Sequence, residues 1–85
     1  MSNILVGNGA YAKVSSGASA DGILINTGGR MDVYTNGQAT SITVSGIFDV
    51  WGSADHVHVC SGGVIYQREG STVTNLIVDE GGSVQ

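Results

Sequence analysis

Three side chains that commonly bind metal ions occupy alternate positions in the sequence: His56, His58 and Cys60. Imidazole nitrogen and thiolate sulfur suit a borderline-soft divalent ion such as zinc. On a β-strand these residues would share one face, and Asp79 is a candidate fourth ligand from a neighbouring strand. Residues two apart on one strand lie about 6.5–7 Å from each other, which is long for converging ligands. The simpler interpretation, three outward polar residues on one strand, therefore stays open beside the metal site.

Two aromatic residues form a second candidate site. Tyr34 and Trp51 each directly follow a valine, Val33 and Val50, in two similar segments. If those segments lie side by side, the two rings stack on the outer surface, and such aromatic platforms bind sugars or anchor protein interfaces. Packing between the strands, which only stiffens a sheet, is the alternative interpretation.

Catalytic and cofactor signatures are absent from the sequence. Ser, His and Asp all occur, but there is no Gly-x-Ser-x-Gly turn and no phosphate-binding glycine loop. A calcium β-roll needs tandem Gly-Gly-x-Gly-x-Asp turns, whereas residues 28–32 read Gly-Gly-Arg-Met-Asp without a second copy. We therefore expect neither an enzyme nor a cofactor.

The elements that must position these residues repeat along the chain. Each begins with a branched apolar residue, a spacer and a second apolar residue, followed within three positions by glycine. The five copies start 19, 19, 15 and 19 residues apart, at Ile4, Ile23, Ile42, Val57 and Leu76. A period of about 20 residues is typical of repeat architectures. In the 15-residue unit we expect one connecting loop to be shortened.

Stacking of the repeats predicts continuous apolar columns. The two apolar residues of each repeat form two columns. The residues three positions before the last four repeats are Ala20, Ala39, Ala54 and Val73. A third column comes from the segment after the glycine: Val14, Val33, Val50, Tyr66 and Val84. These patterns predict an all-β fold, a parallel β-solenoid of about four coils. An antiparallel β-sandwich, with turns every 8–12 residues or so, is the alternative.

The repeats resemble those of AIDA-type autotransporter passengers, the strand-loop-strand repeats of bacterial adhesins. The segment from Ile25 to Val44 follows the approximate family pattern V-x-x-G-G-x-x-x-V-x-x-G-G-x-A-x-x-T-x-V, with one residue inserted before Gly37. The resemblance implies a surface-displayed solenoid stalk that serves adhesion or self-association. It also implies possible glycosylation of serine and threonine, for which the loop candidates are Ser15, Ser16, Ser19, Thr27, Thr35, Thr40, Ser41, Ser61 and Ser71.

Composition limits the partners. The net charge is −4, and only Lys13, Arg30 and Arg68 are basic, which argues against binding to nucleic acid. No apolar run is long enough for membrane insertion. We expect one solenoid domain over residues 1–85, extracellular or on the bacterial surface, with a surface glycan or protein as possible partner. Open strand edges at both ends favour a longer repeat array or a homo-oligomer.

Overall fold

The computed structural model describes residues 2–85, with side chains from residue 4 onward. These residues form ten strands in two sheets. Sheet A contains β1 (Ser2–Val6), β3 (Ser19–Ile25), β5 (Gln38–Val44), β7 (Ser53–Val59) and β9 (Thr72–Val78). Sheet B contains β2 (Tyr11–Val14), β4 (Arg30–Val33), β6 (Ile47–Val50), β8 (Val64–Gln67) and β10 (Ser83–Val84). Residues 2–85 include no helix with the length and hydropathy needed to cross a membrane.

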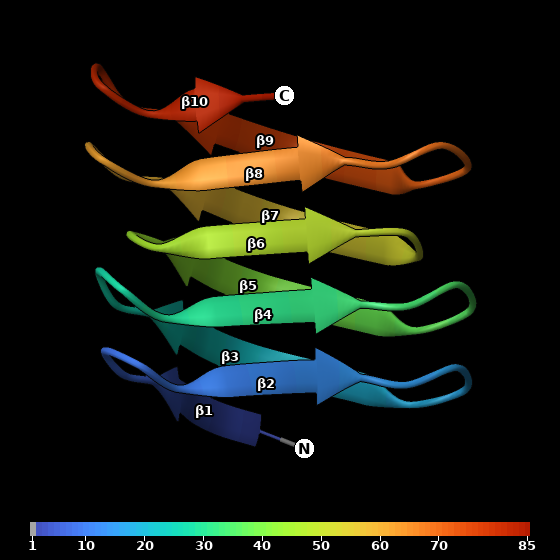
Figure 1. Ribbon diagram of the computed structural model, residues 1–85. Helices are drawn as coiled ribbons and strands as arrows, with labels where there is room; N and C mark the ends of the chain where they lie inside the picture. The colour runs from blue at the N-terminus through green and yellow to red at the C-terminus, as the bar shows by residue number, and fades with distance from the viewer. Residues whose placement is uncertain (1) are drawn as a thin grey trace.

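The chain alternates between the two sheets and climbs by one coil each time it returns. Within each sheet the neighbouring strands are all parallel, in the order β1-β3-β5-β7-β9 and β2-β4-β6-β8-β10. Figure 1 shows the coils stacked from the N-terminus at the bottom to the C-terminus at the top, with sheet B in front. The β-solenoid of about four coils is thereby confirmed. The antiparallel β-sandwich is excluded, because every pair of neighbouring strands is parallel.

The core lies between the sheets, and sheet A contributes its two predicted columns to it. The register aligns Ile4, Ile23, Ile42, Val57 and Leu76 in one column, and Val6, Ile25, Val44, Val59 and Val78 in the next. Members in the middle of the stack are almost completely buried. Each coil alone would leave these side chains in water, so the apolar interior exists only because coils stack.

The predicted column of sheet B is wrong in its last two members. Val50 pairs with Gln67, not with Tyr66, which points to the outer face beside Asp49. Val84 pairs with Ile65 and belongs to a second inward column: Ala12, Met31, Phe48, Ile65 and Val84. Tyr66 is the apolar residue that the repeat pattern favours, but the register of β8 places Gln67 in this column. Gln67 is exposed because β10 pairs only with Val64 and Ile65 and leaves the last part of β8 uncovered.

A left-handed residue interrupts sheet A in every complete coil. Gly22, Ser41, His56 and Asn75 have φ values of 67°, 54°, 57° and 52° and are skipped by the pairing register. Strict alternation would send residues three apart to opposite faces. The extra residue reverses this, so Ala20 and Ile23 both point into the core, as do their equivalents in later coils. This bulge-like feature explains the constant spacing of three seen in the sequence.

The 15-residue unit is shorter because both of its turns are shorter. Four residues connect β3 to β4 and another four connect β4 to β5, whereas two connect β5 to β6 and two connect β6 to β7. Figure 1 shows both turns of this coil ending inside the others. The expectation of one shortened loop was therefore incomplete. Since the strands keep their lengths, the register of the stack continues unchanged through this coil.

Candidate functional site

The outer surface of sheet B gathers side chains that are far apart in the sequence. It carries all three basic residues, all three tyrosines and the only tryptophan of the chain. We call this surface the aromatic–basic face, and its residues are Tyr11, Lys13, Arg30, Asp32, Tyr34, Asp49, Trp51, Tyr66 and Arg68. The solenoid register explains the cluster, because each coil places its outward residues directly over those of the previous coil.

The two predicted aromatic residues lie against each other on this face. The ring centroids of Tyr34 and Trp51 are 5.7 Å apart, with planes inclined by 34°. The guanidinium carbon of Arg68 lies 5.4 Å from the centre of the Trp51 ring and 4.9 Å from that of Tyr66. Both distances fall within the range of cation–π attraction. Arg68 therefore extends the aromatic pair to the next coil.

The other end of the face centres on Tyr11. The Lys13 ammonium nitrogen lies 5.2 Å from the Tyr11 ring centre, and the Arg30 guanidinium carbon 5.9 Å from it. The hydroxyl of Tyr11 donates a hydrogen bond to Asp32. This bond, together with interactions with Tyr34, raises the pKa of Tyr11 well above its usual value. Tyr11 is therefore a neutral hydrogen-bond donor at physiological pH, and it connects the two halves of the face.

Two carboxylates lie buried beneath the basic groups. Asp32 and Asp49 are neighbours in the register and are 3% and 0% exposed. Arg30 donates hydrogen bonds to both carboxylates, and Arg68 donates a second bond to Asp49 over 3.2 Å. Burial raises the pKa of Asp49, while the two guanidinium groups act in the opposite direction. Arg30 bridges the two neighbouring carboxylates, and Tyr11 and Arg68 each add one donor, so the carboxylates fix the positions of the arginines.

The face offers flat rings flanked by fixed hydrogen-bond donors. No pocket opens among residues 2–85, so a ligand would lie along the surface. Sequence reasoning found Tyr34 and Trp51 but missed Tyr11, Tyr66 and the three basic residues. The one feature that marks them in the sequence is position, since each directly follows or precedes an inward residue of its own coil. Finding them therefore requires the register between coils.

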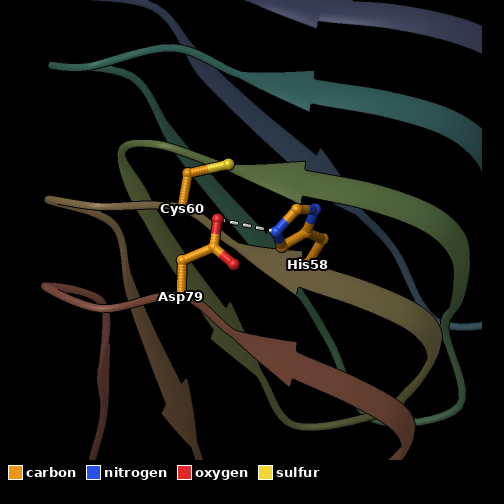
Figure 2. A group of neighbouring side chains, drawn as sticks. All are labelled: His58, Cys60 and Asp79. Carbon is orange, nitrogen blue, oxygen red and sulfur yellow. Dashed lines mark hydrogen bonds and ion pairs between the residues drawn. The ribbon is translucent and has the colours of Figure 1, made fainter.

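The predicted metal ligands divide into two groups. His58, Cys60 and Asp79 lie together, with one ligand atom from each within 4.8 Å of the others. Figure 2 shows the imidazole of His58 directed at the carboxylate of Asp79, and their Nε2 and Oδ2 atoms are 2.9 Å apart. His56 is not brought to this group. It occupies the left-handed position, is 66% exposed, and its Nδ1 lies 3.0 Å from Asp55.

Asp55 stabilises the left-handed turns of two coils, which leads to a pH-dependent prediction. Its carboxylate accepts hydrogen bonds from Thr74, Asn75 and the backbone amide of His56. The bonds from Thr74 and Asn75 are the main cause that lowers the pKa of Asp55 to about 2. Because the folded pKa lies below the unfolded one, ionised Asp55 stabilises the fold at neutral pH, and this contribution disappears between about pH 4 and pH 2.

We expect Asp55→Asn to lower the melting temperature at pH 7, with the gap to the wild-type protein closing as the pH falls to 2. Thermal unfolding followed by circular dichroism across this pH range measures the difference in melting temperature between the two proteins. Asp21→Asn is the matched control, since Asp21 occupies the same column and accepts a hydrogen bond from Thr40. A gap for Asp55→Asn that stays constant from pH 7 to pH 2 would contradict the assignment.

Comparison with known proteins identifies the repeat. Residues 1–47 match the family model described as adhesin of the bacterial autotransporter system, probable stalk. No curated protein matches the chain. A similar solved structure is the crystal structure of a TibC-catalyzed hyper-glycosylated TibA fragment. The two sequences are 26% identical, and the two structures align with a TM-score of 0.79.

The likeness to that fragment covers 98% of this chain and 38% of the fragment. The resemblance inferred from the segment Ile25 to Val44 is thereby confirmed. Glycosylation of the loop serines and threonines stays a prediction for this chain. Since the family model covers more than half of the residues, the chain belongs to the family of bacterial autotransporter adhesins, as a β-solenoid repeat module.

Proposed function

We propose that the module makes its adhesive contact through the aromatic–basic face and that the ligand is a carbohydrate chain. The observation that supports this proposal is the gathering of Tyr34, Trp51 and Arg68 on one face of the solenoid. Aromatic rings pack against the apolar faces of sugar rings, while tyrosine hydroxyl and guanidinium groups donate hydrogen bonds to sugar oxygens. The role is one of binding without catalysis, at the extracellular or cell-surface location that the family suggests.

Because no pocket opens among residues 2–85, the face fits an extended ligand bound weakly at several points. The rings and basic groups of the face come from coils that follow one another, so their spacing follows the separation of about 4.8 Å between strands. Linking many weak contacts along a stack raises the overall affinity by multivalency. A nucleic acid is a poorer fit, because Arg30 and Arg68 are already paired with buried carboxylates.

Replacing Trp51 by alanine tests the proposal. We expect the affinity for a glycan found by array screening to fall about tenfold or more, because truncation removes an aromatic contact of about 0.5–1.5 kcal/mol together with the apolar area that the ring buries. Trp51→Phe keeps a ring and should lose less. Calorimetric titration with the selected glycan measures both variants.

Leu24→Ala provides the control, because Leu24 is exposed on the outer face of sheet A. We expect it to leave glycan binding unchanged. Binding that is lost in Leu24→Ala and kept in Trp51→Ala would place the contact on the wrong sheet and refute the proposal.

A second proposed role is self-association through the ends of the stack. Val78 and Val84 occupy columns whose members in the middle coils are buried, yet they are 40% and 43% exposed. A further coil of the same kind, from the same chain or from another copy, would cover these side chains and pair with the open edge. This exposure supports a longer repeat array or a homo-oligomer as the working form of the domain.

A further inference from the structure

The outer face of sheet A carries a cluster that the proposed glycan contact does not use. His58 lies in β7, Cys60 directly follows that strand, and Asp79 directly follows the neighbouring strand β9. The backbone amide of Asp79 donates to the carbonyl of Val59, which fixes Asp79 next to Cys60 on the adjacent coil. Figure 2 shows the three side chains on the same side of the sheet.

Alternate residues of one strand lie about 6.5–7 Å apart, which is long for ligands that share an ion. The register overcomes this distance, because one ligand comes from the neighbouring coil. His58 and Cys60 are two positions apart in the sequence, but the carboxylate of Asp79 comes from the next coil and lies near both. Ligand atoms around a tetrahedral zinc ion lie about 3.5 Å from one another, given bond lengths of about 2.0–2.3 Å. The cluster, with all three ligand atoms within 4.8 Å, needs only small side-chain rotations to reach this spacing.

The chemistry of the three donors is selective. An imidazole nitrogen, a sulfur and one carboxylate oxygen form a mixed set that suits zinc better than calcium or magnesium, which prefer oxygen ligands alone. Three protein ligands leave a fourth position for water. All basic residues of the chain belong to the other sheet, so none of them competes for Asp79.

The hydrogen bond between His58 and Asp79 does not by itself account for this arrangement. The two side chains are 45% and 48% exposed, and a polar contact this exposed contributes little to stability. Cys60 is a free thiol on the edge of the pair. A shared ion would use all three groups and would join the coil of β7 to that of β9 at the open end of the stack.

We propose that His58, Cys60 and Asp79 bind one zinc ion, with water as the fourth ligand. Binding replaces the hydrogen bond between His58 and Asp79 by two bonds to the metal, and the proton of that hydrogen bond moves to Nδ1 of His58, so that Nε2 binds zinc with its lone pair. The thiol of Cys60 binds as thiolate, and its proton passes to the solvent. The ion then links two successive coils, and binding stabilises the folded state because the unfolded chain does not hold the three ligands together.

Titration of the 85-residue chain, kept reduced with a phosphine, tests the site. We expect calorimetry to show one zinc ion bound per chain and a higher melting temperature in the presence of zinc. Cobalt, which takes the same ligands and is coloured, should give the thiolate-to-metal charge-transfer band. A chain that shows neither stoichiometric zinc binding nor this band would overturn the proposal.

Single variants identify the ligands. His58→Ala, Cys60→Ser and Asp79→Asn should each weaken zinc binding about 100-fold or more, since loss of even an outer-shell partner costs about 10–100-fold. His56→Ala is the matched control and should bind zinc as tightly as the wild type does, because His56 pairs with Asp55 instead. Circular dichroism confirms that each variant is folded. Unchanged binding in Cys60→Ser, or loss of binding in His56→Ala, would refute this ligand set.

Discussion

Replacing Gly46 by alanine is expected to lower the free energy of unfolding by about 3 kcal/mol or more, at the upper end of what overpacking costs. Gly46 ends the two-residue turn between β5 and β6. A Cβ atom on this residue would lie closer than 3.0 Å to the carbonyl oxygens of Gly29 and Asn26, a separation that real Cβ atoms essentially never show. Both oxygens belong to the backbone of the preceding coil, so no side-chain rotation relieves the clash.

Because of the position of Gly46 in the stack, the substitution destabilises the whole domain and not only the turn in which it lies. A solenoid coil is stabilised only by its direct neighbours, and about three repeats are needed for a stable stack. Shifting the backbone between β5 and β6 separates the lower coils from the upper ones. Neither part is large enough to stand alone, since a domain of 85 residues has a total stability of only about 4–13 kcal/mol.

Gly7→Ala is the control for this prediction. Gly7 lies in the turn between β1 and β2, no atom lies within 4 Å of an added Cβ, and its φ is not positive. We expect its effect to stay within about 0.5 kcal/mol, as for an ordinary surface substitution. Urea unfolding monitored by circular dichroism compares the two variants. Equal midpoints of unfolding for Gly46→Ala and Gly7→Ala would show that the close approach of the coils at Gly46 does not limit the stability of the fold.

The glycines illustrate how far the sequence predicts this fold. Their spacing predicts turns, and positive φ at Gly28, Gly62 and Gly81 agrees with that interpretation. The second glycine of each pair has a different role, which is to let one coil lie on the next. In that column the first coil has Ala10, and the later coils have Gly29, Gly46, Gly63 and Gly82. Alanine is tolerated in the first coil because no described coil lies beneath it. A requirement of this kind is a relation between coils, and the spacing within one repeat does not reveal it.

The candidate sites show the same limit. The period of the repeat was sufficient to predict that Tyr34 and Trp51 lie side by side. Alternation failed at His56, because its left-handed backbone interrupts the strand before His58. The face around Arg30 and Arg68 depends on which residue of each coil is inward, and the shortened coil and the polar Gln67 obscured that alignment. Sequence periodicity therefore predicts a column well where every member is apolar, and poorly where a column includes both apolar and polar residues.

The second large effect is expected from Phe48→Ala, which should lower the free energy of unfolding by about 3–5 kcal/mol. Phe48 is 0% exposed and is among the largest fully buried side chains of the described residues. In its inward column it lies between Met31 of the coil below and Ile65 of the coil above. Truncation leaves a cavity closed on both sides by strands held in register, so the surrounding structure collapses only partly into the space.

Val84→Ala is the control, because Val84 lies in the same column but at the end of the stack, where it is 43% exposed. We expect truncation there to cost about 0.5 kcal/mol, and chemical unfolding at low protein concentration measures both variants. Equal losses for Phe48→Ala and Val84→Ala would contradict a core that depends on coils packed from both sides. If a second copy covers the open end, the cost of Val84→Ala should rise with protein concentration while that of Phe48→Ala stays constant, because only the end position gains a partner by association. The pair of variants therefore measures both the internal packing of the solenoid and the self-association proposed for its end.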